Sequence, residues 1–403
     1  MMNLRSRLKA LTQNQQKPLH DNAEVSPSIT DRITRMRETA KQFSVSETEI
    51  AQQLNGIRLA EGVIRIDRHI PLKNLHGEYE LANLKNTPIH FLNKDIGEIN
   101  HQKLVFIDTE TSGLAGGTGT IAFLLGMAKI SEESLHICQW LLLAFRGEQP
   151  MLEDAIEWLT SDSCLVSFNG KSFDIPLLTS RYLQNRMQNP FRELKHLDLV
   201  HPMRRAFSNV WDDCKLQTAE KNLLKLFRQD DLPGAMMPEI WGRVLRSKQF
   251  DMLPQVLEHN HLDILSLPAL TGALSQIYTK PGMEKCNLVG IAERHCEDGR
   301  KSHALEILKH GKEYLDEQGL LMLASLYRME GQVEAALDIW SHLAVNGSSE
   351  GAERLAKYYE HAKRDYAVAL QYAQQIKINK NDVTQRRLSR LHGRLAKQSY
   401  SLI

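Results

Sequence analysis

The segment Leu104-Val-Phe-Ile-Asp108-Thr-Glu110-Thr111 decides the fold, because it joins an unbroken apolar run to two acidic residues. A run that is apolar on both faces is typical of a central strand, and side chains alternate along a strand. Asp108 and Glu110 therefore point to the same side. Two neighbouring carboxylates repel each other unless a cation lies between them, and such oxygen ligands suit Mg²⁺ or Mn²⁺. Because an Asp-x-Glu pattern is common by chance, a metal site needs support from other elements.

The residues around this segment predict an α/β domain. Apolar runs at 120–130 and 134–143 predict two further strands, and residues 150–162 have the composition of a helix. The run at 164–170 predicts a fourth strand, which helices follow to about Tyr278. Three consecutive strands, a helix and a strand parallel to the first give a mixed central sheet flanked by helices.

A third carboxylate, Asp174, follows the fourth predicted strand in the sequence FNGKSFDIPLL at 168–178. Such a junction between strand and helix can direct Asp174 toward the end of the sheet where the acidic pair lies, with Asn169 and Phe173 lining the mouth. The alternative is that Asp174 caps the helix, because Asp is a preferred N-cap residue.

A fourth carboxylate, Asp263, lies in a predicted helix that also carries His259 and His261. Residues four apart share a helix face, so His259 lies beside Asp263, whereas His261 lies on roughly the opposite face. His259 is therefore the expected partner of the acidic group. An ordinary surface helix is the alternative.

Four glycines after the Asp-x-Glu segment predict a turn next to the acidic pair. Without side chains, the turn would let a phosphate or a terminal nucleotide approach the backbone closely. The alternative is a hairpin turn that only requires positive φ angles. These glycines are Gly113, Gly116, Gly117 and Gly119.

A run of basic residues lies between the second and third acidic elements. A groove along a nucleic-acid backbone would use such residues, and nearby aromatic side chains could stack on bases. A solvated helix face with aromatic residues in the core is the more common arrangement. The basic residues are Arg204, Arg205, Lys215, Lys221, Lys225 and Arg228, and the aromatic ones are Phe207, Trp211 and Phe227.

Composition limits the class of protein. A chain of 403 residues exceeds one ordinary domain, and its net charge of +1 gives no overall attraction to nucleic acid, so any contact needs a local patch. Five cysteines without a Cys-x-x-Cys pair fit neither a disulfide framework nor a zinc site. There is no apolar N-terminal signal and no run of about 20 apolar residues that could span a membrane. We expect a cytoplasmic protein with no membrane partner.

The chain divides into four predicted parts. Residues 1–28 are polar and predict a flexible tail, and residues 29–95 predict a helical and short-stranded extension that packs on the following domain. Residues 96–280 form the α/β domain. Residues 284–403 are rich in helix formers and predict an all-α region.

The C-terminal part repeats itself. HALEIL, AALDIW and VALQYA place Ala304, Ala336 and Ala369 at intervals near 33 residues, and LASLYRMEGQ recurs as LAKYYEHAKR. This period resembles that of tetratricopeptide repeats, in which each helix pair buries its face against its neighbours. We expect these repeats to dock a protein partner. An irregular helical bundle is the alternative.

Together the acidic residues occur in the order found in the DEDD exonuclease superfamily, which the chain resembles between the first and the last of them. The resemblance implies a ribonuclease-H-like fold and two Mg²⁺ or Mn²⁺ ions that support phosphodiester hydrolysis. By this resemblance Asp108 bridges both ions. Glu110 and Asp263 hold the first ion, and Asp174 helps to hold the second.

The stretches GLAGGTGTIAFLLG, HLDLVHPMRR, CKLQTAEKNLL, DDLPG and HNHLDILSL are similar to the YprB-like family of predicted bacterial exonucleases. This similarity covers most of residues 60–390. The superfamily resemblance implies a metal-dependent 3′-5′ exonuclease, which we expect to act on single-stranded ends of DNA or RNA. The expected substrate contacts are Thr109, Gly116, Gly117, Thr118, Asn169, Phe173 and Lys215.

One position departs from the superfamily pattern. Its members have a Tyr four residues before the last Asp or a His five residues before it, whereas here His259 is four before Asp263 and Glu258 is five before. A neutral imidazole is a competent base at neutral pH, so His259 is the expected catalytic base. The departure leaves open a weak or inactive nucleic-acid-binding adaptor, and a structure-specific endonuclease of the same fold.

Overall fold

The computed structural model describes residues 45–113, 119–281, 285–376 and 382–400. The predicted tail at 1–28 lies outside these ranges, as do Gly116, Gly117 and Thr118 of the glycine-rich stretch.

A seven-stranded mixed sheet forms the centre of the α/β domain, with the strand order β1-β2-β7-β6-β5-β8-β9. β5 pairs antiparallel with β6 and parallel with β8, which confirms the predicted mixed sheet. The strands are β1 (Ile57–Ala60), β2 (Val63–Pro71), β5 (Leu104–Thr111), β6 (Ala122–Ile130), β7 (Ser134–Leu142), β8 (Cys164–Ser167) and β9 (Lys195–Asp198). A separate two-stranded sheet contains β3 (Leu75–His76) and β4 (Tyr79–Glu80).

Two parts of the central sheet were not foreseen. β2 pairs with β7 along its whole length from Val63 to Pro71, so the short strands predicted near the N-terminus extend the same sheet. β9 is a four-residue strand with the sequence KHLD, which is too short and too polar to stand out by hydrophobic pattern.

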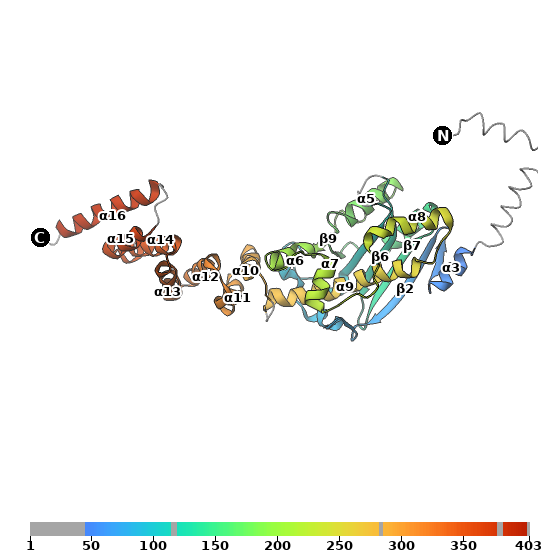
Figure 1. Ribbon diagram of the computed structural model, residues 1–403, viewed down its shortest axis with the longest axis horizontal. Coiled ribbons are helices and arrows are strands. Elements are labelled where there is room, and N and C mark those ends of the chain that lie inside the picture. The colour runs from blue at the N-terminus through green and yellow to red at the C-terminus, as the bar shows by residue number, and fades with distance from the viewer. Residues whose placement is uncertain (1–44, 114–118, 282–284, 377–381, 401–403) are drawn as a thin grey trace, which may run out of the picture. The chain divides into compact units, whose positions relative to one another are not determined.

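Helices cover both faces of the sheet, and side chains alternate between two cores along β5. Val105 and Ile107 pack in one core with α3, α4, α5, α8 and the start of α9, whereas Leu104 and Phe106 pack in the other with α6 and the rest of α9. Figure 1 shows α9 running beside the sheet. The helices are α3 (Glu47–Gln53), α4 (Glu148–Ile156), α5 (Asp174–Gln184), α6 (Val200–Phe207), α7 (Leu216–Ala219), α8 (Met237–Ser247) and α9 (Leu253–Thr279).

The alternation along β5 places its acidic residues. Asp108 and Glu110 continue the series of Leu104 and Phe106, so they point to the face that α9 covers. A π-helical turn, η5 (Glu220–Leu224), packs on α9 and precedes the loop that leads to α8. These elements surround the end of β5.

The C-terminal region is all-helical, as predicted, and each helix packs on the next one in the chain. Alanines recur on equivalent helices and are fully buried: Ala292, Ala324 and Ala356 in one series, and Ala304, Ala336 and Ala369 in the other. A small side chain at such positions lets neighbouring helices approach closely, which favours the repeat interpretation. The helices are α10 (Leu288–Glu297), α11 (Lys301–His310), α12 (Glu317–Met329), α13 (Val333–Val345), α14 (Ser349–Tyr358), α15 (Tyr366–Gln375) and α16 (Asp382–Tyr400).

The first C-terminal helices contact the α/β domain through hydrogen bonds at the end of α9 and at α6. His295 Nε2 donates to the carbonyl oxygen of Tyr278 at 2.7 Å, and Asn287 N donates to that of Ala206 at 2.7 Å. Among the helices that the structure describes, none is long and apolar enough to cross a membrane.

Candidate active site

Four carboxylates from three elements converge at the end of β5. Asp108 and Glu110 come from the strand, Asp174 is the first residue of α5, and Asp263 lies in the first half of α9. Thr109 Oγ1 donates to Asp174 Oδ1 at 2.5 Å, which ties α5 to the strand. The charges of the other three carboxylates all act on Asp108. The four carboxylates that were predicted to be metal ligands thus lie close together.

Asp174 does not cap α5. The N-cap position is occupied by Phe173, which makes no side-chain capping bond, and Asp174 accepts its hydrogen bond from Thr109 instead. A Cβ at Gly170 would lie 2.4 Å from Ser167 Oγ and 3.1 Å from Asp174 Oδ2. Glycine at this position therefore leaves the room that the carboxylate occupies.

The turn before α5 is held by Asp198, a residue at the end of β9 that the sequence did not single out. Its Oδ1 accepts from the backbone N–H of Asn169 at 2.6 Å, and its Oδ2 accepts from that of Lys171 at 3.0 Å. Asn169 has a φ angle of +68°, a left-handed conformation that Asn tolerates better than most residues. Asp198 thus fixes the turn that positions Asp174.

Asn260 is a second residue of the site that sequence reasoning missed. Its Nδ2 donates to Asp108 Oδ2 at 2.9 Å, and its Oδ1 accepts from Gln139 Nε2 at 2.9 Å. Gly126 is paired directly opposite Asp108, and a Cβ there would lie 2.4 Å from Asn260 Oδ1. The spacing along α9 could have identified Asn260, because Asn260 precedes Asp263 by three residues and so lies on the same helix face.

His259 lies beside two of the carboxylates. Its Nε2 is 3.4 Å from Glu110 Oε1 and 3.5 Å from Asp263 Oδ2, which agrees with the predicted shared face of α9. Its Nδ1 donates to Asp231 Oδ1 at 2.7 Å. Asp231 belongs to the DDLPG stretch, for which no role was predicted. His261 is buried elsewhere, and its Nδ1 has no hydrogen-bond partner among the described residues.

A buried arginine balances part of this negative charge. Arg228 contacts Asp263 Oδ1 and Glu220, and its Nη1 donates to Asp231 Oδ2 at 3.0 Å. Its side chain is only 5% exposed, so Arg228 is not available to a nucleic-acid backbone. For this residue the groove interpretation of the basic run is wrong, because the guanidinium is used inside the protein.

Crowding changes the ionisation of the acidic group. Burial, together with the charges of Asp263 and Asp174, raises the pKa of Glu110 to about 9, and burial and the neighbouring carboxylates raise the pKa of Asp108 well above its usual range. Burial also raises the pKa of Asp174 to about 6, although the hydrogen bond from Thr109 opposes this. Burial acts on Asp231 as well, but hydrogen bonds from His259 and Arg228 hold its pKa below the usual range. The charge of Arg228 lowers the pKa of Glu110, but burial and the neighbouring carboxylates outweigh it.

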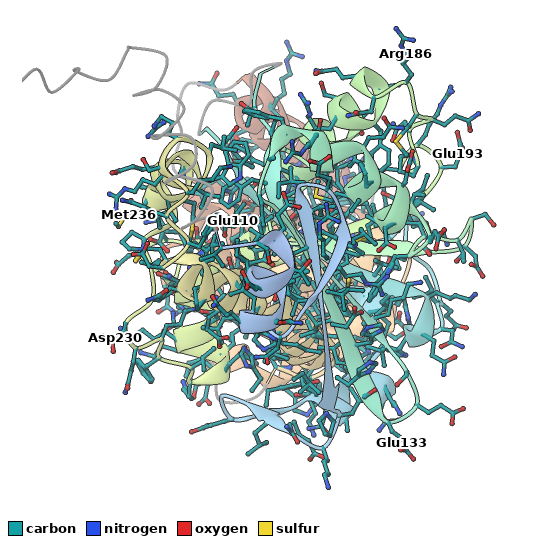
Figure 2. The ribbon with its side chains drawn as sticks, turned by 90° about the vertical axis from the view of Figure 1, so that its right-hand side faces the viewer. Glu110, Glu133, Arg186, Glu193, Asp230 and Met236 are labelled. Carbon is teal, nitrogen blue, oxygen red and sulfur yellow. The ribbon has the colours of Figure 1, made fainter. Side chains whose placement is uncertain are left out.

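A cleft of about 570 Å³ opens beside the carboxylates. Asp108 and Asp174 line it together with Asn169, Thr109 and the exposed ring of Phe173. Gly113 also lines it, at the start of the glycine-rich stretch. Figure 2 shows Glu110 within the outline of the domain, whereas Asp230 and Met236 lie at its edge.

Lys215 does not line this cleft. Its side chain is 79% exposed and its Nζ lies 2.9 Å from Asp213 Oδ2. Phe207 is fully buried and stacks on half-buried Trp211 with ring centroids 3.9 Å apart, so Phe207 is not free to stack on bases, whereas Phe227 is exposed.

Comparison with known proteins agrees with this fold. Residues 105–275 match the ribonuclease H superfamily model RNase_H_2, a span that includes all four carboxylates. The uncharacterized protein YprB of Bacillus subtilis (strain 168) is 30% identical over 350 residues, which cover 82% of this chain and 84% of YprB. The chain therefore belongs to the YprB family, with a ribonuclease-H-like domain whose fold indicates nuclease-type hydrolysis.

Proposed function

We propose that the protein is a metal-dependent 3′-5′ exonuclease that hydrolyses phosphodiester bonds at single-stranded ends of DNA or RNA. The observation that carries this proposal is the convergence of Asp108, Glu110, Asp174 and Asp263 at the end of β5, where the pKa values of Asp108 and Glu110 are raised. Asp108 and Asp174 of this group line the neighbouring cleft. Four hard oxygen donors that crowd one another fit a pair of Mg²⁺ or Mn²⁺ ions. The polarity of degradation comes from the superfamily resemblance.

Each carboxylate would have its own role in metal binding. By the superfamily resemblance, Asp108 would help to hold both ions, while Glu110 and Asp263 would hold the first and Asp174 the second. Two such ions, when bound, activate the attacking water and stabilise the leaving oxygen of the phosphodiester. Phe173 would stack on the terminal base, since its ring is 61% exposed at the cleft wall.

The test is hydrolysis of labelled oligonucleotides by the full chain with Mg²⁺ or Mn²⁺. Asp108→Asn keeps the shape of the side chain and can still face Asn260, but it removes the bridging charge, so we expect activity to fall at least roughly 100-fold. Asp230→Asn is the matched control, because Asp230 is exposed and Asn tolerates its left-handed backbone. Equal background from wild type and Asp108→Asn would contradict the proposal.

Substrate ends separate the related possibilities. Strands labelled at the 5′ end should shorten step by step, and circular single strands should stay intact. Cleavage of the circles would assign an endonuclease. Binding of the oligonucleotide without hydrolysis in either metal would assign an adaptor whose helical repeats dock a partner.

A further inference from the structure

We propose that His259 is a ligand of the first metal ion, together with Glu110 and Asp263, and that Asp231 holds its imidazole in the tautomer that binding requires. The assignment rests on the proposed function only for the presence of metal ions in this site. The family resemblance implies four carboxylate ligands and a separate base, so a nitrogen ligand is a property of this chain.

The three donor atoms already have the spacing of a metal site. His259 Nε2 lies 3.4 Å from Glu110 Oε1 and 3.5 Å from Asp263 Oδ2, and the three atoms lie within 4.8 Å of one another. A divalent ion binds nitrogen and oxygen at roughly 2.0–2.2 Å, so adjacent ligand atoms are roughly 2.8–3.6 Å apart, the lower values in octahedral and the higher in tetrahedral geometry. Both measured separations lie near the upper end of that range.

Asp231 determines which ring nitrogen can bind. Because its Oδ1 accepts from His259 Nδ1 at 2.7 Å, the proton of the neutral imidazole is on Nδ1 and the lone pair is on Nε2. Arg228 Nη1 donates to the other oxygen of Asp231 at 3.0 Å, which fixes the carboxylate in turn. A carboxylate bound to the second nitrogen is the usual support of a histidine that ligates a metal.

The surroundings of Nε2 favour ligation over a role as base. A general base needs the attacking water at its free nitrogen, whereas here two carboxylate oxygens face that nitrogen. An imidazole lone pair that faces two ionised carboxylates is repelled by them, and a metal ion among the three groups turns this repulsion into binding. Arg228 contacts the other oxygen of Asp263, Oδ1, and so leaves Oδ2 for that cation.

A nitrogen ligand changes the choice of metal. Imidazole suits transition metals, whereas Mg²⁺ prefers oxygen ligands and keeps most of its water. The first site should therefore bind Mn²⁺ more tightly than Mg²⁺. Removing the imidazole should weaken Mn²⁺ binding by about 10- to 100-fold and Mg²⁺ binding by less.

The direct test is pulsed electron paramagnetic resonance of the full chain loaded with one equivalent of Mn²⁺. A ligating imidazole couples the ¹⁴N nucleus to the Mn²⁺ electron spin. We expect this coupling in the wild type, its loss in His259→Gln and its retention in His261→Gln, which changes a buried histidine of the same helix outside the site. No coupling in the wild type, or coupling that survives in His259→Gln, would overturn the assignment.

Asp231→Asn keeps the imidazole and tests its support. We expect the ¹⁴N coupling to persist at saturating Mn²⁺ while the Mn²⁺ affinity, measured by calorimetry, falls by about 10-fold or more. Unchanged affinity would remove Asp231 from the proposal. Because this variant retains His259, it gives a result even if His259→Gln fails to fold.

The histidine-ligand proposal and the proposed nuclease function can each fail without the other. Oligonucleotide hydrolysis that depends on Asp108, without ¹⁴N coupling in the wild type, would keep the nuclease and reject the histidine ligand. Coupling that disappears in His259→Gln, without hydrolysis of any oligonucleotide, would keep the ligand and reject the nuclease.

Discussion

Asp108 and Glu110 are held in a space where each carboxylate raises the free energy needed to ionise its neighbours. Their folded-state pKa values are raised, so in the absence of metal the folded protein retains protons that the unfolded chain releases. Stability therefore falls as the pH rises from about 4.5 toward the value of about 9 for Glu110. Cations that bind here should restore that stability.

Stability without metal gives a prediction at the residue scale. Asp108→Asn removes a carboxyl group that stays protonated in the folded protein but ionises in the unfolded chain. We therefore expect the metal-free variant to melt at a higher temperature than the wild type at pH 8, with a free energy of unfolding larger by about 0.5–2 kcal/mol. Adding Mn²⁺ should raise the melting temperature of the wild type more than that of the variant. Thermal unfolding with and without a chelator measures both effects. A variant that melts below the wild type in chelator would contradict the prediction.

At the scale of elements, the site depends on how closely α9 approaches the sheet. β6 has a glycine where β5 has Asp108, and Asn260 of α9 occupies the space above that glycine. The same helix carries His259 and Asp263 one turn apart. The approach of one helix to one strand pair thus sets the distances among most of the site residues.

Gly126→Ala tests this approach. Its Cβ would lie 2.4 Å from Asn260 Oδ1 and 2.8 Å from Ile264 Cγ1, so α9 must shift or Asn260 must leave Asp108. We expect a loss of about 1–3 kcal/mol in the free energy of unfolding together with a loss of nuclease activity. Gly234→Ala is the control, since no atom lies within 4 Å of its added Cβ. Urea unfolding that is the same for both variants would contradict the close packing.

At the scale of the whole molecule, the contact between α9 and α10 joins the α/β domain to the helical region. His295 is fully buried there, and its Nε2 donates to the last turn of α9. Burial lowers the pKa of His295 to about 4, with nearby His303, Arg300 and Arg294 acting in the same direction. Between pH 6.5 and about 4 the unfolded chain takes up a proton that folded His295 does not, so stability is lost as the pH falls through this window.

His295→Gln should reduce that dependence on pH. Gln can still donate to the Tyr278 carbonyl but does not titrate, so the loss of unfolding free energy between pH 7 and pH 5 should be smaller than in the wild type by about 1–2 kcal/mol. Urea titrations at the two pH values give the difference. His310→Gln, at an exposed position of α11, should keep the dependence of the wild type. If His295→Gln also keeps it, the junction is not the source.

Sequence patterns identified the fold class because strands and helices each produce a characteristic period of apolar residues over a short stretch of chain. The apolar run before Asp108 and the alanine spacing beyond residue 281 both correspond to observed elements. β9 and the pairing of β2 with β7 were missed, because strand pairing is a contact between distant segments and a four-residue strand carries little pattern. The order of β1 and β2 at the edge of the sheet likewise follows only from packing.

Some features of the candidate site could likewise be predicted from the sequence, whereas others are visible only in the folded protein. The sequence by itself determined the acidic residues and the shared face of His259 and Asp263, because strand alternation and helix periodicity fix which neighbours point together. Only the tertiary structure decided that Asp231 binds His259, that Asn260 binds Asp108 and that Arg228 is buried among carboxylates. These contacts join residues up to 152 positions apart, and no local pattern encodes the distance between two segments that meet only when the chain folds.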